Sequence, residues 1–266
     1  MIDTHCHLTF PDFAGDEPGA GVAAELAEAA RHGVTGCITI STTTRDCTKA
    51  LAIAQSHARV WCSAGVHPLY ADQGPHDWQA LERCIAERKC VAWGELGLDN
   101  HYPEPGRDVQ HAVLAEQLAF IERVHRARPE LEKPVVLHCR EAFADLIPIL
   151  KRTTLKPDRF VFHCFTGSPA DMRMLLDFGA SVSFTGVLTY RNAADVREAA
   201  KLVPSDRLMV ETDAPFLPPE PVRGKRPCRP WMVRHTAEHL ASVRGLSFEA
   251  MHERLNTNTE KFFGIV

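Results

Sequence analysis

Met1-Ile2-Asp3-Thr4-His5-Cys6-His7, the first seven residues of the chain, read as an apolar strand that ends in a His-x-His pair. Because side chains alternate between the two faces of a strand, His5 and His7 point the same way and can bind one metal ion. A single histidine at the end of a strand is more often a structural residue. The His5–His7 pair therefore indicates a metal site only if further ligands lie close to it.

Four more metal-competent side chains occupy the same kind of position in later strand-like runs. They are Glu95 after 90–94, His138 at the end of 134–138, His163 at the end of 159–163 and Asp213 after 207–211. Six such groups at equivalent places indicate one constellation rather than a coincidence. The sequence thus predicts a site that draws its ligands from distant parts of the chain.

Strand-like runs alternate with segments of helical period from one end of the chain to the other. The eight strand-like runs lie at 2–6, 35–40, 60–65, 90–94, 134–138, 159–163, 180–184 and 207–211. Helical segments lie at 21–32, 44–57, 77–89, 107–128, 141–151, 169–178 and 193–201, and 230–263 adds more helix. This β-α repetition predicts an α/β fold with a parallel sheet, and eight units match a (β/α)8 TIM barrel of the metal-dependent hydrolase type.

A doubly wound open sheet is the rival architecture. It forms its site at one crevice, where the strand order reverses. Here the ligands come from the first, fourth, fifth, sixth and eighth strands. Only a closed barrel brings all of those strand ends to one face, so we expect the site at the C-terminal face of a barrel.

The bulk composition is that of an ordinary globular protein. Of 266 residues, 45% are hydrophobic and 24% charged, and no linker or repeat divides the chain, so we expect one domain over 1–266. The net charge of −4 creates no general field for polyanions. Nine cysteines without C-x-x-C pairs read as reduced thiols, and neither a signal peptide nor a long apolar span is present. These features predict a cytoplasmic protein with no membrane segment and no evident obligate protein partner.

The ligand set indicates more than one ion. Four imidazoles and two carboxylates exceed one tetrahedral site and suit two divalent ions bridged by a carboxylate, for which Glu95 is the natural candidate. Mixed nitrogen and oxygen donors favour zinc, manganese, iron, cobalt or nickel over magnesium. Asp213 precedes Ala214-Pro215, and we expect the proline to hold the loop extended and present the carboxylate. A helix cap is the weaker alternative for Asp213, because Pro-rich sequence follows it.

His67 and Arg140 are the candidates for substrate contact. The forked guanidinium of Arg140 suits phosphate oxygens, but a salt bridge to Glu141 or Asp145 is an alternative. His67, just before Pro68, either donates to a phosphate or caps its own loop.

Two further groups offer contacts to nucleic acid. The loop 223–229 holds four basic residues, which either follow a nucleic-acid backbone or are simply solvated. Phe165, Tyr190 and Phe216 are the aromatic residues placed to stack on bases.

Six motifs in order resemble the TatD family of metal-dependent deoxyribonucleases. They are Asp3-Thr4-His5-Cys6-His7-Leu8, Gly65-Val66-His67-Pro68, Gly94-Glu95-Leu96-Gly97-Leu98-Asp99, His138-Cys139-Arg140, His163-Cys164-Phe165-Thr166-Gly167 and Glu211-Thr212-Asp213-Ala214-Pro215-Phe216-Leu217. The resemblance implies an amidohydrolase-type barrel that binds one to three divalent ions (Zn, Mg, Mn, Co or Ni) and hydrolyses DNA. It also implies as metal ligands His5, His7, Glu95, His138, His163 and Asp213. One departure is that Asn100 and His101 precede Tyr102, where the family usually places an aromatic directly after Gly-Leu-Asp.

We therefore predict a divalent-metal-dependent deoxyribonuclease of the 3'-5' exonuclease type, in which a metal-activated water cleaves phosphodiester bonds. Asp213 would take the proton of that water, and Glu95 would share in catalysis as the bridge. The alternative is a hydrolase of a small ester, lactone, amide or phosphotriester, since the same barrel supports those reactions. Related amidohydrolases often bridge with a carboxylated lysine, so Glu95 favours the nuclease. A non-catalytic metal-binding protein is disfavoured because no ligand is missing.

Overall fold

Eight parallel strands form one sheet in chain order in the computed structural model, which describes residues 1–15 and 21–265. The strands are β1 (Ile2–Cys6), β2 (Gly36–Thr39), β3 (Val60–Ala64), β4 (Cys90–Asp99), β5 (Val135–Arg140), β6 (Phe160–Phe162), β7 (Ser181–Phe184) and β8 (Leu208–Val210). Each strand pairs in parallel with the next. This arrangement confirms the predicted (β/α)8 fold.

The barrel closes between β8 and β1 through a short seam. A parallel bridge joins Cys6 to Ala214, where the Asp213 N–H donates to His5 O at 2.9 Å and the His7 N–H to Ala214 O at 2.8 Å. Deeper along the seam a side chain replaces the ladder, since Thr4 Oγ1 donates to Val210 O at 3.0 Å. The seam therefore holds His5, His7 and Asp213 beside one another.

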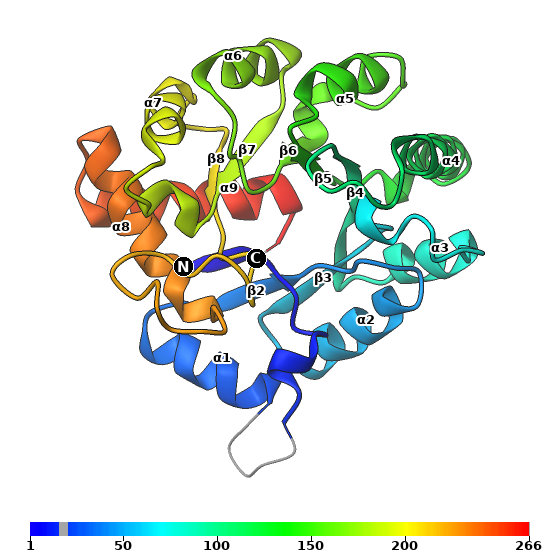
Figure 1. Cartoon of the computed structure of the whole chain (residues 1–266). Helices are drawn as coiled ribbons and strands as arrows, with labels where there is room; N and C mark the ends of the chain where they lie inside the picture. Colours follow the sequence, from blue (N-terminus) through cyan, green and yellow to red (C-terminus); the bar gives the residue numbers. More distant parts are fainter. Residues whose placement is uncertain (16–20, 266) are drawn as a thin grey trace.

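Helices surround the strands, as Figure 1 shows. They are α1 (Val22–Arg31), α2 (Asp46–Ser56), α3 (Trp78–Ala86), α4 (Arg107–Ala127), α5 (Phe143–Leu150), α6 (Pro169–Phe178), α7 (Ala194–Leu202), α8 (Val233–Arg244) and α9 (Phe248–Phe263). Short 3-10 turns lie at Pro11–Phe13, Pro68–Tyr70, Pro129–Leu131, Pro157–Arg159, Gly186–Thr189 and Pro230–Met232. None of the helices in the described ranges is long and apolar enough to cross a membrane.

Local sequence fixes the helix ends, and α6 is the clearest case. Ser168 and Asp171 form a reciprocal capping box, and Pro169 occupies the first turn, where no N–H is needed. Gly179 ends the helix with a φ of 104°, a left-handed conformation that glycine adopts without a steric penalty. The β6–α6 loop is thereby held in place next to His163.

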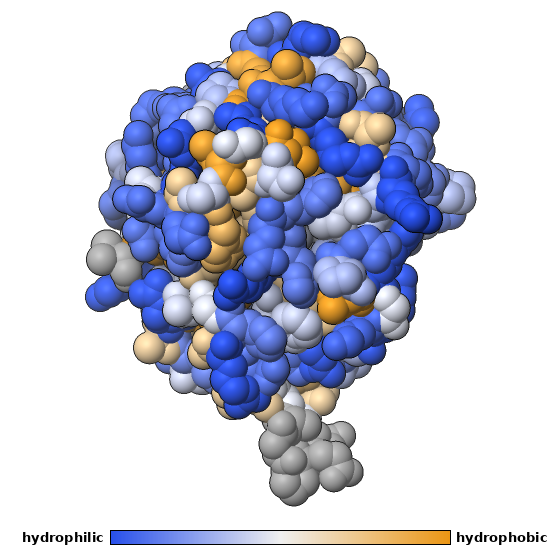
Figure 2. All heavy atoms as spheres, turned by 90° about the vertical axis from the view of Figure 1, so that its left-hand side faces the viewer, coloured by the Kyte–Doolittle hydropathy of each residue, from blue (hydrophilic) through white to orange (hydrophobic). Residues whose placement is uncertain are grey.

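The inside of the barrel is filled with apolar side chains at the end away from the site. That cluster consists of Ile2, Ile38, Ile40, Trp61, Val91, Ala92, Val136, Val161, Met209, Phe262, Phe263 and Ile265. Its last three members come from the end of α9 and the residues after it, so the C-terminal segment seals this end of the barrel. The opposite end of the barrel interior holds polar side chains. On the outside, the face shown in Figure 2 is largely hydrophilic and carries small separate apolar groups.

Two predicted strand ends were wrong. The run 90–94 continues as β4 to Asp99, which places Glu95 in mid-strand, and β5 continues past His138 to Arg140. The extensions pair with each other, from Leu96 opposite Leu137 to Asp99 opposite Arg140. This extra ladder follows a register shift in β4, and it carries both strands beyond the positions where their apolar runs end.

Candidate metal centre

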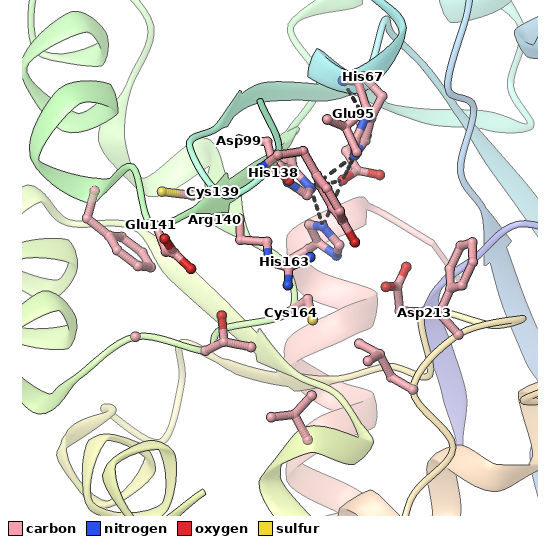
Figure 3. A pocket seen from close by; sticks show the side chains of 18 of the residues that line it. His67, Glu95, Asp99, His138, Cys139, Arg140, Glu141, His163, Cys164 and Asp213 are labelled. Atoms are coloured by element: carbon pink, nitrogen blue, oxygen red, sulfur yellow. Dashed lines mark hydrogen bonds and ion pairs between the residues drawn. The ribbon is translucent and has the colours of Figure 1, made fainter. Parts of the chain in front are cut away.

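The predicted ligands converge around one cavity of about 870 Å³ at the C-terminal ends of the strands. Five of them line it, namely His7, Glu95, His138, His163 and Asp213. His5 is fully buried beside Glu95 and Asp213 instead of on the cavity wall. Figure 3 shows His67, Glu95, His138 and His163 grouped on one side and Asp213 facing them from the segment after β8. The structure therefore brings together the whole predicted set.

Glu95 lies at the centre of the cluster. Its Oε2 is 3.1 Å from His5 Nε2, while its Oε1 is 2.9 Å from His138 Nδ1 and 2.7 Å from His163 Nε2. The two carboxylate oxygens thus face two different groups of imidazoles. Such an arrangement suits a carboxylate that is shared between two cations.

Asp213 faces the other side of the cluster. Its Oδ1 lies 3.3 Å from His7 Nε2 and 3.6 Å from His5 Nε2. The predicted extended backbone at this residue was wrong, because Asp213 has a φ of 57° in the left-handed region. Aspartate tolerates this conformation better than most residues, and the resulting turn directs the carboxylate toward β1.

Three histidines are held by outer hydrogen bonds so that their free nitrogen faces the cluster. His7 Nδ1 lies 3.1 Å from Ile40 O, an acceptor only, so Nδ1 carries a proton and Nε2 is the nitrogen directed at Asp213. His138 Nε2 lies 2.8 Å from Asp99 Oδ2, so His138 Nδ1 faces inward. Outer partners of this kind are typical of histidines that bind metals.

His163 follows the same rule through Glu211. Its Nδ1 lies 3.1 Å from Glu211 Oε1, which also accepts the Cys164 N–H at 2.7 Å. The second oxygen, Oε2, accepts the hydroxyl of Ser183. Glu211 is therefore fixed from three sides, and His163 Nε2 is directed at Glu95.

His67 has the opposite arrangement. Its Nδ1 accepts the Leu69 N–H at 3.0 Å, so its Nε2 carries the proton and points toward Glu95 Oε1 at 3.4 Å. Burial lowers the pKa of His67 to about 4, despite the opposing charge of Glu95. His67 is thus a neutral hydrogen-bond donor to the cavity, and it caps the 3-10 turn Pro68–Tyr70 at the same time.

Buried polar atoms without a hydrogen-bond partner indicate whether the cluster can bind cations. Both ring nitrogens of His5, together with Glu95 Oε2, are buried and have no hydrogen-bond partner among the residues described. Leaving such groups unsatisfied is costly, and a divalent cation between His5 Nε2 and Glu95 Oε2 would satisfy both. The ligand atoms of His5, His7 and Glu95 all lie within 4.8 Å of one another, which is close enough to share an ion.

Charge in the cluster is balanced between acids and imidazoles. Burial opposes ionisation of Glu95, but the charges of His163 and its neighbours outweigh burial and hold the pKa of Glu95 well below its usual range. Burial likewise opposes protonation of His163, but Glu95 and Glu211 raise the pKa of His163 well above its usual value. The site therefore favours positive charge among its carboxylates, and a metal ion can replace the protons.

Sequence reasoning missed the outer partners Asp99 and Glu211. Both residues belong to motifs of the predicted site, but neither of them was predicted to be a hydrogen-bond partner of a histidine. A signal was available, since Asp99 lies four positions after Glu95 on the same strand and face, and Glu211 lies two positions before Asp213. Asp3 is a similar case, because it is fully buried and accepts both the N–H of Thr212 and its hydroxyl.

Arg140 lines the cavity and forms no ion pair within residues 1–15 and 21–265. The salt bridges weighed as its alternative role are absent because the carboxylates have other partners. Glu141 pairs with His101 at 2.8 Å, and Asp145 accepts from Asn100 at 2.8 Å. The guanidinium is therefore available to a ligand.

The predicted base-stacking residues behave differently from one another. Phe165 is buried against Phe143 and Phe184, so the prediction that it could stack on a base was wrong. Tyr190 donates to Pro218 O and is not on the cavity wall. Phe216 lines the cavity and is 45% exposed, which suits the predicted role.

The basic loop 223–229 also lies outside the cavity wall as described. Arg229 forms an ion pair with Glu25, and Arg223 lies over the Tyr190 ring at 3.9 Å. At least these two cations serve local packing. A simply solvated loop therefore does not describe Arg223 and Arg229, and the contact of this loop with nucleic acid stays a prediction.

The barrel and its cluster of imidazoles and carboxylates define a metal-dependent hydrolase. More particularly, the chain belongs to the TatD related DNase family, whose model matches residues 2–264. The predicted family is thereby confirmed.

Relatives cover the whole chain. It is 38% identical over 266 residues to the uncharacterized metal-dependent hydrolase YcfH of Escherichia coli K12, covering 100% of this chain and 96% of the relative. It is 34% identical to a 3'-5' ssDNA/RNA exonuclease TatD of Pantoea ananatis, covering 100% of both. Among solved structures, the TatD homologue YjjV of Escherichia coli K12 matches with a TM-score of 0.88 and 31% identity, covering 100% of this chain and 98% of that one.

Proposed function

We propose that this protein is a 3'-5' exonuclease that hydrolyses phosphodiester bonds at the end of single-stranded DNA. The observation that carries the proposal is the pairing of a Glu95-centred cluster with Arg140, a guanidinium that is free of carboxylates and lines the same cavity. A cation cluster beside an unpaired guanidinium suits a phosphodiester. The name of the Pantoea ananatis relative, a 3'-5' ssDNA/RNA exonuclease, supports the polarity and the substrate.

The proposed metal ligands are grouped around Glu95. His5, His7 and Asp213 would hold one ion, and His138 and His163 a second, with Glu95 shared between them. One to three divalent ions fit this donor set, and its nitrogen content favours zinc, manganese, cobalt or nickel over magnesium. Ions bound there would supply Lewis acidity, which acidifies water and offsets negative charge on phosphoryl oxygens.

The protein's own groups would then divide the remaining work. Arg140 would hold the phosphate, and the Nε2–H of His67 would donate to a phosphoryl oxygen as negative charge develops. Asp213 would accept the proton of the attacking water. Burial opposes ionisation of Asp213, but the hydrogen bond from His7 and nearby imidazole charges lower the pKa of Asp213, which keeps it a base.

A small-molecule hydrolase is the second candidate, because a cavity of about 870 Å³ also lies within the range of small-ligand pockets. Among the residues described, no lysine lines the cavity, so the carboxylated-lysine bridge of related hydrolases has no counterpart here. Glu95 in its place favours the nuclease.

The test is hydrolysis of 5'-labelled single-stranded DNA by metal-stripped protein that is resupplied with Mg²⁺, Mn²⁺, Zn²⁺ or Co²⁺ in turn. We expect stepwise shortening from the 3' end that requires a metal and is lost in the Asp213→Asn variant. Intact DNA, with metals shown to be bound, would refute the nuclease, and hydrolysis of small esters or lactones under those conditions would establish the second candidate.

A further inference from the structure

Tyr102 is an exposed aromatic side chain at the edge of the metal cavity. It lines the cavity and yet 47% of its surface is exposed, whereas most aromatic residues of this chain are buried. A large ring left open beside an active site is a typical contact for a ligand. It belongs to the segment in which Asn100 and His101 depart from the pattern of the family.

The backbone beneath the ring is fixed by Asp99. Asp99 Oδ1 accepts the N–H groups of His101 at 2.9 Å and Tyr102 at 3.1 Å, while its Oδ2 holds His138. The Tyr102 backbone is therefore tied to the same carboxylate that orients a proposed metal ligand. This connection anchors the backbone that carries the ring.

The residues before Tyr102 tie the loop to the β5–α5 connection and keep Arg140 free. Asn100 Nδ2 donates to Asp145 Oδ2 at 2.8 Å and to Glu141 O at 3.1 Å. His101 Nδ1 lies 2.8 Å from Glu141 Oε1. Asn100 and His101 thus bind both neighbouring carboxylates, and neither carboxylate pairs with Arg140.

The freed guanidinium lies against the exposed ring. Arg140 Cζ is 5.0 Å from the centre of the Tyr102 ring, and both residues line the cavity. Figure 3 shows Arg140 in the same cavity as His138 and His163. A flat apolar face next to an unpaired cation matches one kind of ligand, a nucleotide, which carries a planar base beside a phosphate.

We propose that Tyr102 and Arg140 form a platform that stacks an unpaired nucleobase next to the scissile phosphate. This inference rests on the proposed function and adds the determinant for the base. In a duplex the terminal base is paired with the other strand and stacked on its inner neighbour, and freeing it costs energy, so the platform favours single-stranded ends. Because every base offers a π face, the platform accepts all four.

The experiment compares two 5'-labelled single-stranded oligonucleotides, one of thymidines and one with abasic tetrahydrofuran residues at its last two 3' positions. KM and kcat are measured for wild type, Tyr102→Leu, Tyr102→Phe and, as a control at an exposed apolar residue away from the site, Leu246→Ala. We expect wild type to have a KM about tenfold lower for the thymidine oligonucleotide, as stacking of one base provides. Tyr102→Leu should lose this preference, while Tyr102→Phe and Leu246→Ala should keep it.

The outcomes separate the platform from the nuclease itself. An unchanged base preference in Tyr102→Leu, with both oligonucleotides still hydrolysed, overturns the platform and leaves the exonuclease standing. Failure of metal-loaded wild type to cleave either oligonucleotide overturns both. Retention of the preference by Tyr102→Phe shows that the ring, and not the fold of the loop, carries the effect.

Discussion

Asp99 Oδ2 lies 2.8 Å from His138 Nε2 and so fixes which nitrogen of that histidine faces Glu95. Burial opposes ionisation of Asp99, but the hydrogen bond and charge of His138, together with the backbone N–H groups of Tyr102 and His101, outweigh burial and lower the pKa of Asp99, so its carboxylate stays ionised and accepts from His138. Outer partners of this kind set the orientation and basicity of a metal-binding imidazole. The pair links the metal centre to the loop that carries Tyr102.

Replacing Asp99 should weaken metal binding. We expect Asp99→Ala to lower the affinity for Mn²⁺ or Zn²⁺ by about 10- to 100-fold, because His138 loses its orienting partner. Calorimetric titration of metal-stripped protein measures this directly. Asn100→Ala is the matched control, since it loosens the same loop without touching His138. Equal affinities in Asp99→Ala and wild type would remove Asp99 from the centre.

His67 and His138 should respond differently to truncation. His67 presents its protonated nitrogen, so His67→Ala should retain metal and lose about 10²-fold in kcat, the usual cost of one missing hydrogen-bond donor. His138→Ala should lose metal as well as activity. Metal content by mass spectrometry alongside kcat separates the two roles. Loss of metal from His67→Ala would identify His67 as a ligand.

Gln117 should be a strong determinant of stability near the site. Its side chain accepts the Val66 N–H at 2.9 Å and donates to Val66 O at 2.8 Å, directly before His67. Gln117→Met leaves two buried backbone groups unsatisfied and should lower the free energy of unfolding by about 2–5 kcal/mol. Urea unfolding measures the change, and Glu116→Met on the exposed side of α4 should stay within about 0.5 kcal/mol of wild type.

His125 should make stability fall at acidic pH. Its Nε2 accepts the indole N–H of Trp93 at 3.0 Å, and burial lowers the pKa of His125 below the ordinary value of 6.5. As the pH falls below that value, the unfolded chain takes up a proton before the folded chain does, so this contribution is complete above pH 6.5 and is lost at lower pH.

The His125→Gln variant isolates this effect, because an amide oxygen can accept from Trp93 but does not titrate. Urea unfolding at about pH 7.5 and about pH 5.5 should show a smaller acid loss in His125→Gln than in wild type. Identical losses in the two proteins would place the acid sensitivity elsewhere.

Much of the fold could be predicted because, in a barrel, the order of the strands along the chain determines their positions around the barrel. Once eight alternating strands were recognised, the side chains at their ends had to meet at one face, and His5, His163 and Asp213 do so. The full length of β4 was harder to predict from the sequence. Gly94 and Gly97 have φ values of 117° and 148° and interrupt the apolar run, so the strand seemed to end where it continues along β5.

Side-chain direction could not be predicted from spacing. Whether a histidine offers a lone pair or a proton depends on its outer partner, and that partner comes from another strand for His138 and His163 but from its own turn for His67. The exposure of Tyr102 and the burial of Phe165 likewise depend on tertiary packing. The single-domain organisation and the cytoplasmic location stay predictions.

Anomalous diffraction from crystals loaded with Mn²⁺ tests the central claim most directly. The account predicts two ions that share Glu95, one bound by His5, His7 and Asp213 and the other by His138 and His163, with His67 outside both coordination shells. Ions bound away from Glu95, or an ion coordinated by His67 Nε2, would contradict it.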